Sequence, residues 1–262
     1  MKIALIGCGN LGLSLLNGVL GNSAIKNEDI YITKRNLKAI LHFEKDGIHV
    51  TSDNKKAIKN SELIVIAVKP YDVEKVLVDI TPYLNAKKHI VISLATAVTI
   101  QEINKKIALD VPVFRAMPNT AADIKQSMTC ISSNNANEEQ IEKVKSFFNL
   151  IGNTIFIKED LMEAATVLGA CGIAYVLRFM RSMVQGGIQI GFDSKTATEI
   201  VNHVVKGAAE LLIERKEHPE HEIDKVTTPK GCTIIGLNEM EHNGFSSSLI
   251  KGITASYKQI EK

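Results

Sequence analysis

The chain begins with Lys2-Ile-Ala-Leu-Ile-Gly-Cys-Gly-Asn-Leu-Gly12, a short apolar run that leads into glycines spaced Gly7-x-Gly9-x-x-Gly12. The apolar residues do not alternate with polar ones, which predicts a parallel strand buried on both faces. In such a loop the first glycine allows a tight turn, the second lets the backbone approach a pyrophosphate, and the third lets the next helix pack on the strand. The helix start presents free N–H groups to the anion. The stretch therefore predicts a dinucleotide-binding strand, turn and helix.

Glycine loops also occur in ordinary strand-to-helix turns, so the surrounding sequence has to distinguish the two. Here the strand begins at Lys2, and an apolar helix face follows directly. That face is formed by Leu11, Leu13, Leu15, Leu16 and Val19. This context favours the dinucleotide interpretation over a purely structural turn.

The overall composition limits the classes of protein to consider. The chain has 262 residues, enough for two domains, and a net charge of +2 from 31 Lys and Arg against 29 Asp and Glu. This balance does not predict a nucleic-acid partner. Apolar runs are short and broken by charge, so we expect no membrane span. Four cysteines lie far apart, which predicts a reducing compartment and neither a disulfide framework nor a metal site. We therefore expect a cytoplasmic globular protein.

Strand and helix patterns alternate through the first half of the chain. The expected strands after the first are Asp29–Thr33, Gly47–Val50, Leu63–Ala67, His89–Ser93, Val111–Arg115, Met128–Ser132 and Thr154–Ile157. The expected helices between them are Leu37–Lys45, Lys55–Lys59 behind an Asp53 N-cap, Val73–Leu84, Thr99–Ile107 and Glu138–Leu150. Thr99-x-x-Glu102 has the pattern of a capping box. Such alternation predicts βαβ units and a doubly wound α/β sheet.

The strand patterns stop after about Lys158, and helical spacing takes over. Expected helices are Leu161–Gln189, interrupted near Gly169–Gly172 and ended by Gly186-Gly187, then Lys195–Arg215 and Phe245–Ile260. We interpret Met162, Met180 and Met183 as core residues. The polar segment Glu217–Thr228 contains His218 and His221, which fit a solvated turn better than a ligand pair. We predict a dinucleotide-binding domain over residues 1–157 and a helical domain over 158–262, apolar enough for an oligomer interface.

The end of the second strand, Ile32-Thr-Lys-Arg-Asn36, bears on the choice of cofactor. Sites for NAD usually place Asp or Glu here to hold the ribose 2′-hydroxyl, whereas NADP sites offer positive charge to the 2′-phosphate. This segment has no acid and two cations, Lys34 and Arg35. The pattern favours NADPH, with NADH as the alternative donor and a solvated loop as the alternative without function.

Three later strand ends are expected on the edge where open α/β sheets bind ligands. They are Ala67-Val-Lys-Pro70, Ser93-Leu-Ala-Thr96 and Arg115-Ala-Met-Pro-Asn-Thr120. We expect Pro70 to impose an extended geometry that presents backbone groups to the nicotinamide ribose. Small and polar residues at three successive strand ends predict the rim of a cleft, with ordinary loops as the alternative.

The most unusual stretch of the helical half is Val226-Thr-Thr-Pro-Lys-Gly-Cys-Thr-Ile-Ile-Gly236. Two threonines, a proline and a glycine precede an apolar helix. Thr233 and the free N–H groups near Gly231 and Cys232 should therefore lie at a helix start, which can bind a carboxylate. A plain N-cap is the alternative.

Together these segments resemble the pyrroline-5-carboxylate reductase family. The matching segments run the length of the chain: Ile6–Gly12, Ala67–Pro70, Val98–Ile100, Met117–Thr120, Gly172–Tyr175, Thr227–Thr233 and Gly236-Leu237. The resemblance implies an N-terminal Rossmann domain and an all-α dimerisation domain, in homodimers often assembled into decamers. The substrate would be 1-pyrroline-5-carboxylate, the precursor of proline.

The resemblance also implies a set of site residues. For NADPH these are Ile6, Gly7, Gly9, Asn10, Leu11, Gly12, Lys34, Arg35, Asn54, Ala67, Val68, Lys69, Pro70, Ala95 and Asn119. For the substrate they are Lys230, Gly231, Cys232 and Thr233, with Thr233 as the catalytic residue. The hydroxyl of Thr233 would bond to the ring nitrogen while backbone N–H groups hold the carboxylate, and hydride would pass to the C5=N bond.

Several positions depart from the family pattern. Pro229-Lys-Gly-Cys-Thr233 stands where Pro-Gly-Gly-Thr-Thr is usual, and Cys171-Gly-Ile-Ala-Tyr175 where Ser-Gly-Pro-Ala-Tyr is usual. Gly231 and Thr233 are retained, whereas Lys230, Cys232 and Ile173 bear on substrate range and efficiency. A related imine or keto-acid reductase and a non-catalytic NADPH-binding redox sensor are the alternative functions. The lack of lysine in Leu161–Gln185 counts against β-hydroxyacid dehydrogenases, which use one in that region.

Overall fold

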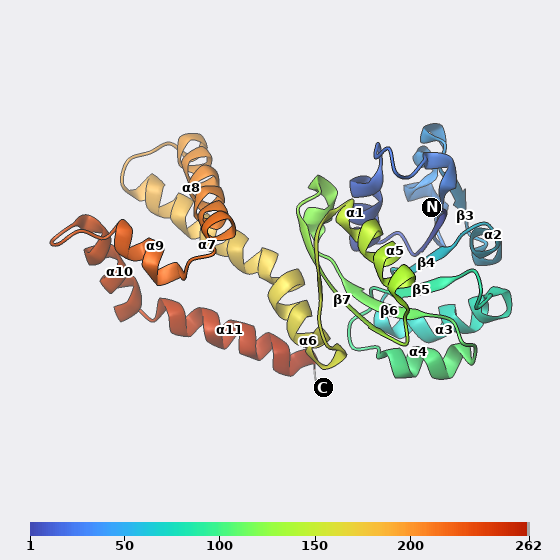
Figure 1. The fold of residues 1–262 in the computed structure, drawn as a ribbon. Helices are drawn as coiled ribbons and strands as arrows, with labels where there is room; N and C mark the ends of the chain where they lie inside the picture. The colour runs from blue at the N-terminus through green and yellow to red at the C-terminus, as the bar shows by residue number, and fades with distance from the viewer. Residues whose placement is uncertain (261–262) are drawn as a thin grey trace. The chain divides into compact units, whose positions relative to one another are not determined.

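A computed structural model describes residues 1–260 of the chain (Figure 1). The chain divides into two compact units. The first comprises Met1–Cys171 together with the C-terminal residues from Tyr257, and the second comprises Gly172–Ser256. The first unit contains the sheet, and the second is helical.

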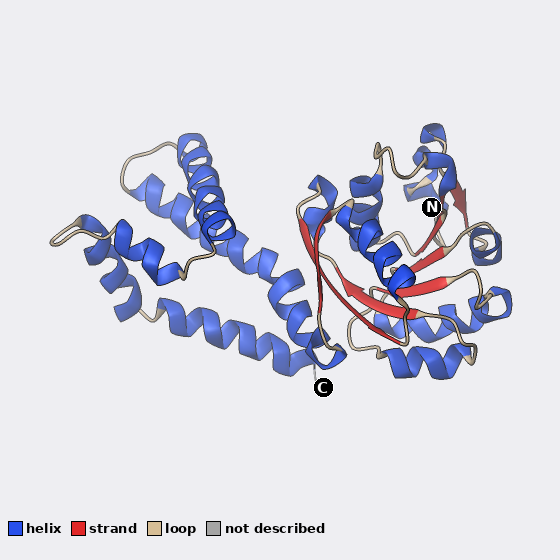
Figure 2. Cartoon of the chain, viewed as in Figure 1, coloured by secondary structure: helices blue, strands red, loops and turns tan. Residues whose placement is uncertain are grey.

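The first unit is built on one eight-stranded sheet (Figure 2). Its strands are β1 (Ile3–Ile6), β2 (Ile30–Thr33), β3 (His49–Thr51), β4 (Leu63–Ile66), β5 (Ile90–Ser93), β6 (Val113–Met117), β7 (Ser127–Asn134) and β8 (Gly152–Phe156). Their spatial order is β3-β2-β1-β4-β5-β6-β7-β8, and every neighbouring pair is parallel except β6 and β7. All eight predicted strands are therefore confirmed, with small shifts at their ends.

Helices cover both faces of this sheet, as a doubly wound fold requires. One face packs against α1 (Asn10–Val19) and α5 (Glu138–Asn149), and the other against α2 (Asn54–Lys59), α3 (Pro70–Ile80) and α4 (Ile100–Ile107). Strand β1 shows why its sequence does not alternate. Ile3 and Leu5 belong to the first core, while Ala4 and Ile6 belong to the second. Two buried faces require an unbroken apolar strand.

The predicted helix starts at Asp53 and Thr99 are confirmed. The Asp53 side chain accepts a hydrogen bond from the Lys56 N–H, and Thr99 forms a complete capping box with Glu102. The helix predicted over Leu37–Lys45 is wrong, because two 3₁₀ turns, Leu37–Ala39 and Leu41–Asp46, occupy the segment. Its apolar residues Leu37, Ile40 and Phe43 recur every third position. That spacing aligns side chains on a 3₁₀ turn, and all three pack on the core.

A short helix α6 (Met162–Ala165) follows the sheet and continues into a π-turn over Thr166–Cys171. This π-turn coincides with the interruption predicted near Gly169–Gly172. It is the last segment of the first unit before the long helix α7.

The second unit consists of helices. They are α7 (Gly172–Gln189), α8 (Ser194–Arg215), α9 (Pro219–Lys225), α10 (Cys232–His242) and α11 (Phe245–Ile260), the last of which extends beyond Ser256. Gly186 and Gly187 do not end α7 as predicted. A Cβ on Gly187 would lie 3.1 Å from the Cβ of Ala197, so glycine there allows α7 and α8 to approach closely. Helix α9 lies within the segment predicted as a solvated turn.

The second unit has a very small core of its own. In residues 172–256 the buried apolar side chains are Val184, Ala197 and Val201, with Met180, Met183 and Val205 packed against them. Many large apolar side chains of this unit remain exposed, including Leu177, Ile213 and Ile250. An exposed apolar surface of this extent is typical of an interaction site.

One helical run in the described part of the chain, Glu159–Gln189, is long and apolar enough to cross a membrane by length and composition alone. The sequence predicts a helix over most of this run, Leu161–Gln189, but no membrane span. A single helix of this kind is weak evidence for a membrane span, because helices that pack against protein satisfy the same criterion.

Candidate active site

The glycine loop joins β1 to α1, and two of its glycines are required by close contacts. Gly7 has φ of +91°, and a Cβ there would lie 2.8 Å from the carbonyl oxygen of Ala67. A Cβ on Gly12 would lie 2.5 Å from the carbonyl oxygen of Gly7. Around Gly9, in contrast, no atom lies within 4 Å of the Cβ position. The loop therefore packs tightly against the protein at its ends and leaves open space at its middle.

The start of α1 fits an anion. Gly9 is the N-cap residue, and no side chain accepts a hydrogen bond from the first turn, which also contains no acidic residue. The N–H groups of a first helical turn have no partner within the helix. They are therefore free for a phosphate group, as the sequence predicts, and the open space over Gly9 fits the pyrophosphate of a dinucleotide.

A pocket of about 1110 Å³ lies at the carboxyl ends of the parallel strands, where open α/β sheets bind ligands. It brings together thirteen of the predicted cofactor residues: Ile6, Gly7, Gly9, Asn10, Leu11, Lys34, Arg35, Asn54, Ala67, Val68, Lys69, Pro70 and Ala95. Gly12 and Asn119 do not line it. Gly12 is buried where α1 packs on the loop, and the Asn119 side chain donates to the carbonyl oxygen of Gly169.

Lys34 and Arg35 both reach the pocket, but they make different contacts. The Lys34 ammonium donates to the carbonyl oxygen of Cys8 at 2.7 Å. The Arg35 guanidinium lies 3.2 Å from a carboxylate oxygen of Asp72, and its side chain is 84% exposed. Lys34 therefore holds the glycine loop against the end of β2, whereas the exposed Arg35 side chain can turn toward a ligand.

Asn54 connects two elements at the same end of the pocket. Its Oδ1 accepts from the Thr33 hydroxyl at 2.7 Å, and its Nδ2 donates to Asp79 at 2.8 Å. The extended geometry predicted from Pro70 is present in the residue before it. Lys69 is the extended residue, with ψ of 150°, while Pro70 is the first residue of α3. This follows from proline's effect on the residue before it, and from its suitability for the first helical turn.

Leu94, Thr96, Met117 and Thr120 line the pocket, and they belong to the strand ends predicted as the rim of a cleft. Several other lining residues were not predicted, and some of these are neighbours of predicted residues: Cys8, Thr33, Asn36, Ser52, Asp72, Lys75, Val76 and Asp79. Three others, Thr166, Ala170 and Cys171, come from the π-turn, for which the only sequence signal was the break in helical spacing. Burial raises the pKa of the Cys8 thiol to about 11, against a smaller opposite effect of Lys34, so this cysteine is protonated at neutral pH.

The predicted substrate residues lie in the second unit. Helix α10 begins at Cys232, with Gly231 as an N-cap residue that has no side-chain cap. Thr233 is therefore in the first turn, as predicted. Lys230 has φ of +61°, and a Cβ on Gly231 would lie 2.5 Å from the Thr228 hydroxyl oxygen. The helix start thus offers free N–H groups beside a threonine hydroxyl, which suits a carboxylate with a polar neighbour.

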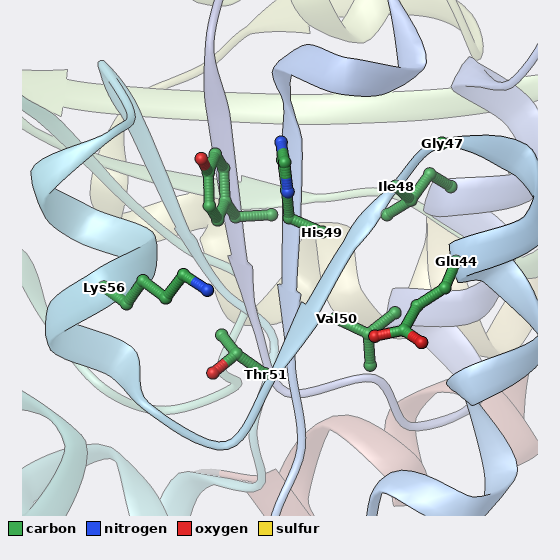
Figure 3. A pocket seen from close by; sticks show the side chains of 8 residues that line it. Glu44, Gly47, Ile48, His49, Val50, Thr51 and Lys56 are labelled. Carbon is green, nitrogen blue, oxygen red and sulfur yellow. The ribbon is translucent and has the colours of Figure 1, made fainter.

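A second, smaller pocket of about 320 Å³ lies along the edge strand β3 (Figure 3). Its lining includes His49, Thr51, Lys56 and Glu44, and the Tyr31 ring stacks on His49 with centroids 4.3 Å apart. None of the predicted site residues lines it. The large pocket is therefore the candidate active site in this unit.

Two family models match the chain. One, described as pyrroline-5-carboxylate reductase dimerisation, matches residues 159–262. The other, described as NADP oxidoreductase coenzyme F420-dependent, matches residues 2–97. The first covers the helical part and the second covers the glycine loop and the first half of the sheet.

Relatives match over nearly the full length of the chain. Pyrroline-5-carboxylate reductase 1 of Dictyostelium discoideum is 42% identical over 97% of this chain, which spans only 48% of that longer protein. Pyrroline-5-carboxylate reductase 2 of the same organism is 39% identical over 100% of this chain and 92% of its own length. The crystal structure of Plasmodium falciparum pyrroline carboxylate reductase with NADP bound has a TM-score of 0.90 at 26% identity, covering 99% of this chain and 97% of that one.

Proposed function

The chain belongs to the pyrroline-5-carboxylate reductase family, and on this premise we propose that it reduces 1-pyrroline-5-carboxylate to proline with NADPH. It is then an oxidoreductase of proline biosynthesis that acts on a C=N bond. The observation that best supports the proposal is the 39% identity across the whole chain to a reductase of that name.

The residues present fit NADPH. The free N–H groups of α1 and the space over Gly9 suit the pyrophosphate, and Arg35 lies where a 2′-phosphate would need positive charge. Ala67–Pro70 and Ala95 line the part of the pocket at the ends of β4 and β5. When bound there, the reduced nicotinamide supplies the hydride. The protein contributes binding, orientation and electrostatics.

We assign the substrate to the start of α10. The Gly231 N–H donates to the Thr228 carbonyl, so the free N–H groups of Cys232 and Thr233 hold the carboxylate of the cyclic imine. The Thr233 hydroxyl bonds to its ring nitrogen. Two contacts on a rigid five-membered ring fix its orientation, and such positioning can lower a barrier by several kcal/mol. These residues and the cofactor pocket belong to different units, and the reaction requires both.

We propose that the enzyme is a cytoplasmic homodimer, with a pentamer of dimers as the larger assembly. The exposed apolar side chains of residues 172–256, and the match to a dimerisation model, support an interface there. We place the NADPH-binding domain at residues 1–157 and the helical dimerisation and substrate domain at 158–262. Sedimentation of the purified protein would distinguish monomer, dimer and decamer.

A spectrophotometric assay tests the function. We expect the purified chain to oxidise NADPH rapidly with 1-pyrroline-5-carboxylate, slowly with small keto acids, and not at all without substrate. A higher rate with keto acids would indicate the related reductase instead. NADPH binding without turnover on any substrate would indicate the redox sensor.

A further inference from the structure

The π-turn over Thr166–Cys171 forms one wall of the cofactor pocket through Thr166, Ala170 and Cys171. A π hydrogen bond spans five residues instead of four, so the turn contains one residue more than an α-turn. Cys171 therefore returns to the side of the helix that Thr166 and Ala170 occupy. The Thr166 hydroxyl also bonds back to the Met162 carbonyl at 2.8 Å, a contact that often bends helices. The shape of this wall depends on the π geometry.

The wall lies beside the ends of β5 and β6, since Leu94, Ala95, Met117 and Thr120 line the same pocket. The glycine loop that suits the pyrophosphate follows β1, and in doubly wound sheets the second half of the dinucleotide extends from there over the strands beyond β4. The π-turn is therefore next to the nicotinamide end of the proposed binding site.

Strand β6 and the corner after it hold this helical run at two points. Arg115, whose side chain is only 2% exposed, contacts Glu163 at 2.7 Å and Glu159 at 3.4 Å. Asn119 donates from Nδ2 to the carbonyl oxygen of Gly169 at 3.1 Å, inside the π-turn. The Asn119 contact is the one that reaches the pocket wall itself.

Asn119 is 6% exposed and its polar atoms are used within the protein. Its Oδ1 accepts from the Ala121 N–H at 3.0 Å, which caps the following 3₁₀ turn, and its backbone N–H donates to the Ser127 hydroxyl at 3.0 Å. Asn119 does not line the pocket. A side chain in this position affects a bound cofactor through Gly169 rather than by touching it.

We propose that Asn119 is a positioning residue for hydride transfer, which holds the π-turn so that Ala170 and Cys171 fix the nicotinamide end of the pocket. The inference rests on the proposed reductase function. It adds to that function a residue that acts by fixing the position of the π-turn. It replaces the direct cofactor contact that the sequence predicted for Asn119.

Substitution of Asn119 can separate its two hydrogen bonds. In Asn119→Asp and Asn119→Ser a side-chain oxygen remains to cap the Ala121 N–H, since Asp and Ser are good caps, but the amide that reaches Gly169 is lost. The matched control is Asn60→Asp. The Asn60 Nδ2 also donates to a backbone carbonyl, that of Lys56 at 2.9 Å, and lies outside the pocket lining.

We expect both Asn119 variants to lower kcat/KM for the imine at least tenfold, while the Kd for NADPH changes less than threefold. Hydrogen exchange of the amides of residues 169–173 should accelerate in both. The Asn60→Asp control should leave kcat/KM, Kd and the exchange of these amides as in the wild type.

A loss of NADPH affinity as large as the loss of kcat/KM would overturn the proposal, because it would indicate direct contact with the cofactor. Unchanged exchange at residues 169–173 would overturn it as well. These readouts do not require turnover. If the wild-type chain reduces no imine, the proposed function fails, while exchange still tests the contact between Asn119 and the π-turn.

Discussion

The ammonium group of Lys34, at the end of β2, donates a hydrogen bond to the carbonyl oxygen of Cys8 in the glycine loop at 2.7 Å. The loop is also held to the same strand end by the Gly7 N–H, which donates to the Thr33 carbonyl at 3.0 Å. The neighbouring cation, Arg35, makes only an exposed ion pair with Asp72, and such pairs contribute little to stability. Two adjacent cations thus have different roles.

Lys34→Ala should therefore weaken the binding of NADPH and NADH alike, by about tenfold, since a hydrogen bond to a charged group contributes about 1.5–3 kcal/mol. Arg35→Ala should weaken NADPH only. The double variant should shift the preference toward NADH. The chain contains no Trp, so the fluorescence of the reduced cofactor can be titrated without tryptophan emission. An unchanged NADPH to NADH ratio in the double variant would rule out the 2′-phosphate assignment.

Gly9→Ala and Gly12→Ala should have different effects, the first on NADPH affinity and the second on stability. The Gly12 Cβ would press on the Gly7 carbonyl, so Gly12→Ala should cost about 1–3 kcal/mol of unfolding free energy. The Gly9 Cβ meets open space, so Gly9→Ala should fold normally and lose at least tenfold in NADPH affinity, because the methyl group occupies the space for the pyrophosphate. Denaturation and cofactor titration measure both effects. Normal NADPH binding by Gly9→Ala would contradict the assignment.

Thr233→Ala should lower kcat/KM for the imine by about tenfold, the effect of one hydrogen bond. The Kd for NADPH should stay nearly the same, because the residue lies in the helical unit and not in the cofactor pocket. Thr233→Ser retains the hydroxyl and is the control. Full activity in the alanine variant would show that the Thr233 hydroxyl is not needed.

His89 should make stability fall in mild acid. Burial, with a smaller contribution from Lys88, lowers the pKa of this histidine below its ordinary value of 6.5. The folded chain then binds fewer protons than the unfolded chain, so the free energy of unfolding decreases as pH falls below about 6.5. Denaturation at pH 7.5 and 5.5, at one protein concentration, measures the loss. His89→Gln should reduce this dependence on pH, and an equal dependence in both proteins would contradict the assignment.

Two acidic groups provide an internal comparison for that experiment. Hydrogen bonds from Lys143 to Glu62, and from Thr99 to Glu102, lower the pKa values of these carboxyl groups below 4.5. Their contribution to stability is present above pH 4.5 and is lost in more acidic solution. The loss between pH 7.5 and 5.5 therefore reports on His89 and not on these carboxylates.

Much of the sheet could be predicted because burial on both faces requires apolar residues at consecutive positions of a strand. Strands such as Leu63–Ile66 are uniformly apolar, and their order along the chain defines a doubly wound fold. The place of the pocket could also be predicted, because the carboxyl ends of the predicted parallel strands lie at one edge of the sheet. The contacts of Lys34 and Asn119 could not be predicted, because they depend on residues distant in sequence.

Helix α9 shows a different kind of failure, because its local signals were present. Pro219 is the first helical residue, His218 caps the Glu220 N–H, and Lys225 closes the last turn. The polar composition of the segment outweighed these signals in the prediction. An exposed helix shows no apolar periodicity in the sequence, so it can be predicted only from its capping residues.

The small core of the second unit has a consequence for how the protein acquires its structure. Three buried apolar side chains in 85 residues, from Gly172 to Ser256, are far too few to offset the conformational entropy of ordering that segment. In the proposed homodimer its helices obtain most of their burial from a second chain, and folding of this unit and subunit association then become one bimolecular event. We expect the folded fraction to depend on protein concentration, and dilution to inactivate the enzyme before heat or denaturant is applied.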